Sequence, residues 1–137
     1  MATLEQHLTF DGDCETAIET YVAAFDANIL TLLRYRDAQA LHPARLADHI
    51  ARAELEVFGA RLVLGDSPGA HPRGAEATTG IVLLLPEPAR RQAVAVLAEE
   101  HGRVLVAEPR TDHTATLEVI DAFGVLWHLG VRGLQAA

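Results

Sequence analysis

An internal repeat constrains the fold of this chain more than any other feature of its sequence. The stretches LEVFGARLVLG (residues 55–65) and IDAFGVLWHLG (residues 120–130) both carry Phe-Gly, then five residues, then a second glycine. In this alignment Phe58 matches Phe123 and Val63 matches His128. Repetition of a structural unit is typical of a fold built by duplication. We therefore expect two halves with the same arrangement of elements.

The order of the expected elements repeats in the same way. In each half an alternating or apolar strand precedes an amphipathic helix, and three strands follow. Asp13 is placed to act as the N-cap of the first helix, and Pro86 and Pro88 begin the second. The strands are expected at residues 5–10, 29–36, 51–58, 60–66, 79–85, 103–108, 114–120 and 125–131. The sequence therefore predicts a single α+β domain over residues 1–137, with module one at about 1–66, a linker at 67–78 and module two at about 79–137.

Composition limits the classes of partner and the compartment. The chain has 137 residues, of which 50% are hydrophobic, so it can bury the core of one domain. A formal net charge of -8 argues against nucleic acid and anionic membranes as partners. No apolar run approaches the ~20 residues that span a bilayer, and residues 1–10 do not resemble a secretory signal. With Cys14 as the single cysteine, we expect a reducing cytoplasm.

The chain has Phe10, Gly12 and Asp13 before its first helix, and Asp121, Phe123, Gly124 and Trp127 near its end. These stretches resemble the vicinal oxygen chelate superfamily, which includes glyoxalases, bleomycin-resistance proteins and extradiol dioxygenases. They are similar to its PhnB-like branch in particular. The branch pattern of an aromatic residue, a glycine turn and a helix is met by Phe10, Gly12, Asp13, Ala17, Ile18 and Tyr21. The branch signature D-x-F-G-x-x-W is met by Asp121, Phe123, Gly124 and Trp127. This resemblance covers nearly the whole chain.

The resemblance implies two βαβββ modules whose mixed sheets curl around a shared cavity, with the helices outside. It also implies a homodimer, because members of the superfamily often pair. In metal-dependent members, four ligands lie on the first and last strands of each module. Those strands begin here near Gln6, Arg61, Thr79 and Val125.

Histidine occurs on two of these four strands. His128 alternates with Trp127 and Leu129, which are suited to pack under a helix, so His128 is expected to face the cavity. On the first strand, His7 faces inward if Leu8 faces the helix. A shift of one residue would place Gln6 there instead.

The other two positions lack a metal ligand, because the strand at 60–66 has Val63 and the strand at 79–85 has Thr79 or Gly80. The usual metal set is therefore incomplete. Polar residues that alternate with apolar ones should face the cavity, and the predicted cavity set is His7, Arg52, Glu54, Glu56, Glu118 and His128. A glutamate could still complete a site for iron, zinc, nickel or manganese, and the predicted set would then be His7, His128 and Glu56.

Two functions follow as hypotheses, beside a domain that has no small ligand and is retained for assembly, and no reaction or catalytic residue is assigned. The first is a protein that binds a small polar molecule in its cavity without a metal or other cofactor. Because carboxylates outnumber bases in the predicted cavity, a polar or cationic ligand is favoured. The alternative is a metal-dependent lyase or dioxygenase that uses His7, His128 and a glutamate.

Cys14 lies at the start of the first predicted helix, where a thiolate would be stabilised. No base is adjacent in sequence, so we expect this thiol to have no catalytic part.

Overall fold

The computed structural model describes residues 5–39, 41–67, 80–99, 102–107 and 117–131. The chain divides into two compact units, and each is described by itself. The first unit comprises residues 1–22 and 26–72, and the second comprises residues 23–25 and 73–137. Neither helix in the described part of the chain is long and apolar enough to cross a membrane.

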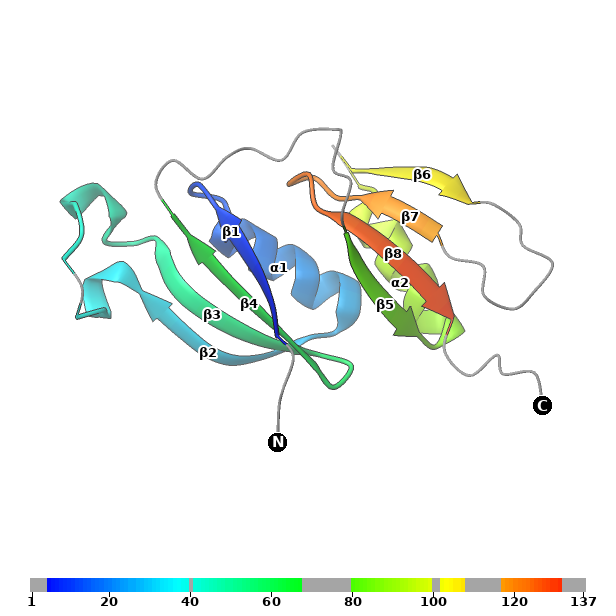
Figure 1. Ribbon diagram of the computed structural model, residues 1–137, viewed down its shortest axis with the longest axis horizontal. Coiled ribbons are helices and arrows are strands. Elements are labelled where there is room, and N and C mark those ends of the chain that lie inside the picture. Colours follow the sequence, from blue (N-terminus) through cyan, green and yellow to red (C-terminus); the bar gives the residue numbers. More distant parts are fainter. Residues whose placement is uncertain (1–4, 40, 68–79, 100–101, 108–116, 132–137) are drawn as a thin grey trace. The chain divides into compact units, whose positions relative to one another are not determined.

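The sheet of the first unit has four strands in the order β1-β4-β3-β2. Strand β1 is parallel to β4, and the other neighbours are antiparallel. Two short 3-10 turns, Tyr35–Asp37 and Ala44–Leu46, lie between β2 and β3. The bounds are β1 Glu5–Phe10, α1 Cys14–Phe25, β2 Asn28–Arg34, β3 Ile50–Val57 and β4 Ala60–Asp66 (Figure 1).

The second unit repeats this plan with a sheet in the order β5-β8-β7-β6. Strand β5 is parallel to β8, as β1 is to β4. The bounds are β5 Ile81–Leu85, α2 Glu87–Leu97, β6 Arg103–Ala107, β7 Leu117–Ile120 and β8 Leu126–Val131. The predicted α+β fold with two βαβββ modules is therefore confirmed. The predicted linker, 67–78, lies outside the described residues except for Ser67.

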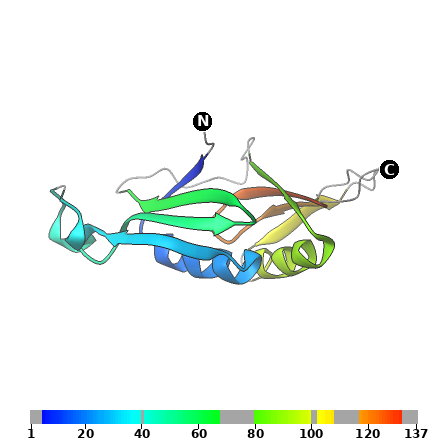
Figure 2. The same ribbon diagram turned by 90° about the horizontal axis from the view of Figure 1, so that it is seen from below.

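Each sheet is covered by a helix on one face only (Figure 2). Leu8 and Phe10 of β1 and Ala53 and Leu55 of β3 are buried, as expected for the face that the helix covers (Figure 2). The strand residues that alternate with them point to the other side, which we call the open face. In the first unit the open face carries His7, Thr9, Arg52, Glu54, Glu56 and Arg61. In the second unit it carries Val82, Leu84, Glu118 and His128.

The start of α1 differs from the prediction in its chemistry. Asp13 occupies the N-cap position, but its side chain makes no capping hydrogen bond. The carboxylate of Asp66 replaces it, because Asp66 Oδ1 accepts the backbone N–H groups of Gly12 at 2.9 Å and Cys14 at 3.0 Å. The end of β4 therefore satisfies the helix that follows β1, and the two elements are held together.

Candidate functional site

A β-bulge in β3 shapes the open face of the first unit. Leu33 pairs with Arg52 and Arg34 pairs with Ile50, which leaves Ala51 as an extra residue. A bulge re-aims the side chains on either side of it. Ile50 is consequently fully buried, whereas Arg52, two residues later, points to the open face.

Gly65 of β4 lies beside this bulge. A Cβ atom on Gly65 would lie 2.8 Å from the carbonyl oxygen of Ala51, so the close approach of the two strands requires glycine. The β3–β4 register runs from the pair Ala53–Leu64 onward. Ile50, which lies before that point, donates its N–H to Asp66 Oδ2 at 3.1 Å. The bulge and the glycine together leave a hollow where the side chains of a regular sheet would lie.

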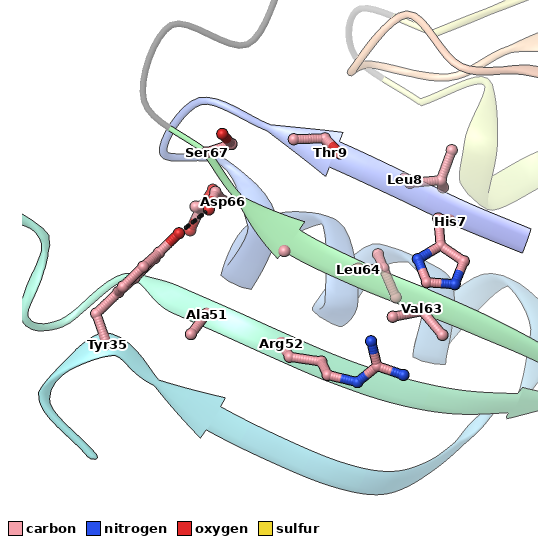
Figure 3. A pocket seen from close by; sticks show the side chains of 11 residues that line it. His7, Leu8, Thr9, Tyr35, Ala51, Arg52, Val63, Leu64, Asp66 and Ser67 are labelled. Atoms are coloured by element: carbon pink, nitrogen blue, oxygen red, sulfur yellow. Dashed lines mark hydrogen bonds between the residues drawn. The ribbon is translucent and has the colours of Figure 1, made fainter. Parts of the chain in front are cut away.

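A pocket with a volume of about 280 Å³ lies at this place in the first unit. Figure 3 shows its side chains, with His7 and Arg52 on either side of Val63 and with Tyr35 at the opposite end. Hydroxyl groups and charged groups line it together with small residues. The lining residues are His7, Leu8, Thr9, Tyr35, Ala51, Arg52, Val63, Leu64, Gly65, Asp66 and Ser67.

Asp66 organises the end of the pocket near Tyr35. Its side chain is buried, and its two carboxylate oxygens accept three backbone N–H groups, as described above. Its backbone carbonyl accepts the hydroxyl of Tyr35 at 2.5 Å (Figure 3). Asp66 is therefore a structural residue that holds β4, α1 and the Tyr35 ring in place.

Charged side chains form a network over the strands next to the pocket. Arg52 donates from Nε and Nη2 to Glu54 Oε1, at 3.2 and 3.1 Å. Arg61 donates to the other oxygen of Glu54 at 3.2 Å. His7 Nε2 lies 3.3 Å from Glu5 Oε2. Glu54 thus bonds two guanidinium groups, and the imidazole of His7 is held by a carboxylate of its own strand.

The predicted cavity residues fall into three groups. His7 and Arg52 line the pocket. Glu54 and Glu56 lie on the same open face but outside the pocket lining, and Glu56 accepts a hydrogen bond from Asn28 at 3.4 Å. The remaining two, Glu118 and His128, belong to the second unit and contact each other.

In the second unit, His128 Nδ1 lies 3.3 Å from Glu118 Oε1. These two residues are cross-strand partners, and Val82 of β5 lies opposite His128 on the other side. Val82 and Leu84 are 65% and 55% exposed, so apolar side chains lie beside the His128–Glu118 contact on this open face.

The Asp121 turn between β7 and β8 explains the D-x-F-G-x-x-W signature physically. Asp121 is buried, and its Oδ1 accepts the N–H groups of Phe123 and Val125 at 2.9 and 3.0 Å. Its Oδ2 accepts the indole N–H of Trp127 at 2.9 Å. Gly124 provides the positive φ of 82° that the turn needs. The signature therefore describes a folding element.

The strand positions where a metal-binding relative would need ligands do not form a set within either unit. Val63 lies opposite His7 in the first unit, and Val82 lies opposite His128 in the second. Each unit thus offers one imidazole and one hydrocarbon side chain at these positions. Within the described ranges, no three His, Cys, Asp or Glu side chains form a cluster that could hold a metal ion.

Cys14 is buried beneath the pocket region, beside Asp66. Burial, together with the negative charges of Asp66 and Glu15, raises the pKa of the Cys14 thiol to about 12. The expectation that the helix start stabilises a Cys14 thiolate is wrong. Burial and the nearby carboxylates destabilise the thiolate more than the helix terminus stabilises it. The thiol is protonated at neutral pH and is a poor nucleophile.

Sequence reasoning missed four of the lining residues that shape the pocket: Tyr35, Gly65, Asp66 and Ser67. Gly65 carried a usable signal, because glycine inside a strand often marks a bulge or a close backbone approach. Asp66 and Ser67 were assigned to a strand end and to the linker. Asp66 bonds partners 16 to 54 residues away, such as Ile50 and Gly12, and Ser67 donates its N–H to the distant Phe10 carbonyl. Local sequence patterns do not report such contacts.

Comparison with known proteins gives matches only at the level of structure. No family model matches the chain, and no curated protein does. Protein PA1353 from Pseudomonas aeruginosa is similar with a TM-score of 0.79 and 24% identity, over 96% of this chain and 98% of that one. A PhnB protein from Bacillus cereus, described as a putative 3-demethylubiquinone-9 3-methyltransferase, has a TM-score of 0.73 and 20% identity, over 95% and 99% of the chains.

A third similar structure is a mutant of FosX, a genomically encoded fosfomycin resistance protein from Listeria monocytogenes, complexed with Mn(II) and 1S,2S-dihydroxypropylphosphonic acid. Its TM-score is 0.67 at 10% identity, over 95% of this chain and 92% of that one. These similarities establish that the chain has the vicinal oxygen chelate fold, as the sequence predicted.

Proposed function

We propose that this protein binds a small polar molecule in the pocket of its first unit, and that binding there needs no metal. The observation that carries this proposal is the hollow formed by the Ala51 bulge and Gly65, with hydrogen-bonding groups around it. Pockets with a few convergent polar groups are where small ligands bind in proteins. Thr9 and Ser67 offer hydroxyls, and Arg52 offers a charged donor.

The valines opposite both histidines favour this proposal over a metal enzyme. A catalytic divalent ion usually has three or more protein ligands, and a hydrocarbon side chain takes the place of one ligand in each unit. His7 is instead held by Glu5, and Glu54 is neutralised by Arg52 and Arg61. His7 and Glu54 are therefore part of a hydrogen-bonded surface network.

The test is a matched pair of substitutions on the open face. Thr9→Val removes a hydroxyl that lines the pocket, and Thr31→Val makes the same change on the same face, outside the lining. Saturation-transfer NMR with glycerol, acetamide, glycolamide and glycolate would identify a binder. We expect Thr9→Val to weaken its binding several-fold, in line with ~1 kcal/mol for one hydrogen bond, and Thr31→Val to leave it unchanged. Binding by none of the probes, or equal loss in both variants, would refute the proposal.

A metal-dependent lyase or dioxygenase remains the second candidate, and the His128–Glu118 contact is the observation that favours it. A carboxylate that bonds one imidazole nitrogen orients the other nitrogen toward a metal in many sites. His7 and a glutamate, Glu56 as predicted, would have to supply further ligands from the first unit. In that unit Glu54, not Glu56, lies in the same strand row as His7, across Val63.

Metal content distinguishes the two candidates. Protein purified without chelator or affinity tag would be analysed for iron, zinc, nickel and manganese, together with His128→Ala. Near-stoichiometric metal that is lost in the variant would favour the enzyme. We expect no metal to co-purify and no change in melting temperature when these ions are added.

We further propose that the protein is a cytoplasmic homodimer. Exposed apolar side chains on edge strands, such as Ile29 of β2 and Val82 of β5, offer surface for association. The buried, protonated thiol of Cys14 is compatible with a reducing compartment. Light scattering coupled to gel filtration would test the assembly, and a monomer at micromolar concentration would contradict it.

A further inference from the structure

The lining of the pocket contains one guanidinium group and one carboxylate, and they differ in what they can offer a ligand. Arg52 brings a guanidinium group to the lining. The carboxylate among the lining residues is that of Asp66, and both its oxygens are occupied by backbone N–H groups. Glu54 and Glu56 lie outside the lining. Among the lining residues, carboxylates therefore do not outnumber bases, and Arg52 is the charged group with donors to spare.

Arg52 keeps a charged hydrogen-bond donor for a ligand. Its Nε and Nη2 atoms bond Glu54, and Glu5 lies 4.0 Å from Nη2. Its Nη1 group makes no hydrogen bond to any residue in the described part of the chain. Glu54 is shared with Arg61, so Arg52 does not have this carboxylate to itself, and Nη1 stays available as a charged donor. A guanidinium fixed on one side and open on the other is well suited to bind a carboxylate.

The opposite part of the pocket is lined by hydroxyl groups. Thr9 lies two residues beyond His7 on β1, a distance of about 6.6 Å along the strand, and Ser67 follows β4. Hydroxyls donate and accept hydrogen bonds equally well. The volume of about 280 Å³ lies just below the range of about 300–1,000 Å³ typical of pockets for drug-sized molecules. The ligand is therefore short, and its two ends differ in polarity.

We infer that the pocket binds a small carboxylic acid in its ionised form, with the carboxylate on Arg52 and a hydroxyl or amino group between Thr9 and Ser67. This inference deepens the proposed function and rests on it. It names a ligand class, whereas the proposed function requires only that a small polar molecule binds at this place.

Glycolate and glycolamide provide the test, because they have nearly the same shape and hydroxyl group but differ in charge. Their affinities would be measured by titration with detection of ¹H–¹⁵N chemical shifts, at constant ionic strength. We expect glycolate to bind at least ~10-fold more tightly than glycolamide, as a charge-assisted hydrogen bond contributes more than a neutral one.

Arg52→Gln and Arg61→Gln form a matched pair of variants. Both arginines bond Glu54 and both side chains are 46% exposed, but Arg61 does not line the pocket. We expect Arg52→Gln to abolish the preference for glycolate and Arg61→Gln to retain it. Arg52→Lys, which keeps the charge without the planar fork, should retain part of it.

Two results would overturn the inference and are distinguishable from failure of the proposed function. Equal binding of glycolate and glycolamide, weakened by Thr9→Val but not by Arg52→Gln, would leave a neutral polar ligand in the same pocket. An equal loss in Arg52→Gln and Arg61→Gln would assign the effect to the general charge of the face. Absence of binding by both probes would refute the inference together with the proposed function for these ligands.

Discussion

The two open faces of the molecule have the same plan and different chemistry. The middle row of the first sheet reads His7, Val63 and Glu54 from β1 through β4 to β3. The corresponding row of the second sheet reads Val82, His128 and Glu118 from β5 through β8 to β7. Both rows contain one histidine, one valine and one glutamate, but the histidine and the valine have exchanged strands.

Because of this exchange, the two histidines have different neighbours. His7 lies beside a bulge, a guanidinium and hydroxyl groups, and Glu54 in its row is bonded by two arginines. His128 is paired directly with the glutamate of its own row and is flanked by exposed Val82. A duplicated fold thus supplies equivalent positions, and the neighbours of each position decide between a ligand pocket and an isolated dyad.

The largest expected effect concerns Asp66 and Asp121, the buried carboxylates among the described residues, one in each unit. Asp66 and Asp121 each accept three N–H groups, so Asp→Asn at either position puts an amide group against a donor. We expect each change to lower the free energy of unfolding by ~3–5 kcal/mol, measured by urea denaturation. Asp11→Asn, at an exposed position, is the control and should change it by less than ~0.5 kcal/mol. If Asp66→Asn resembles this control, Asp66 does not hold the first unit together.

The thiol of Cys14 gives the first unit a contribution to pH dependence that has no thiol counterpart in the second unit, since Cys14 is the chain's single cysteine. Its pKa is raised to about 12 from an ordinary value of 9.0, so the native state binds the proton more tightly than the unfolded state. This contribution to stability is complete below about pH 9 and is lost as pH rises toward about 12. Comparison of urea unfolding at pH 8 and pH 10.5 should show a smaller decrease in Cys14→Ala than in the wild type. An equal decrease in both would contradict the cause assigned to the pKa.

Gly65 and Gly59 distinguish the bulge from an ordinary turn in the first unit. A methyl group on Gly65 would lie 2.8 Å from the Ala51 carbonyl, whereas a methyl group on Gly59 would meet no atom within 4 Å. We expect Gly65→Ala to cost ~1–3 kcal/mol because the strands must separate. Gly59→Ala should cost ~1 kcal/mol because of the positive φ of 83°. The free energy of unfolding of both variants would be measured by thermal unfolding. If Gly65→Ala loses less stability than Gly59→Ala, the bulge tolerates a side chain.

The histidine that β1 carries and β5 lacks can be added to the second unit. Val82→His would place an imidazole directly opposite His128, which is already paired with Glu118. Two imidazoles and a carboxylate form a set suited to zinc or nickel. We expect Val82→His to raise Zn²⁺ affinity by ~10-fold, about 1.4 kcal/mol, in calorimetric titrations. Leu84→His, on the same strand and face but opposite Gly130, should not; equal gains in both variants would contradict the row geometry.

The sequence predicted the element order well, because alternation and helical spacing are local properties. His7 faces the open side, as expected, since Leu8 and Phe10 are buried. The pocket itself was not predictable in this way. The residues around the Ala51 bulge do not differ in type from those of a regular strand, so β3 itself carries no sequence signal of the bulge. The roles of Asp66 and Tyr35 depend on contacts between distant segments. The Val63–His128 match of the repeat did indicate where the two units differ.

The most direct test of the central claim is a map of where a small polar ligand contacts the wild-type protein. Titration with glycolate, followed in ¹H–¹⁵N spectra, would give the amide shifts of both units at once. We predict the largest shifts at Thr9, Gly65 and Ser67, around the pocket of the first unit. Largest shifts at Glu118 and His128, or no shifts in either unit, would contradict the account.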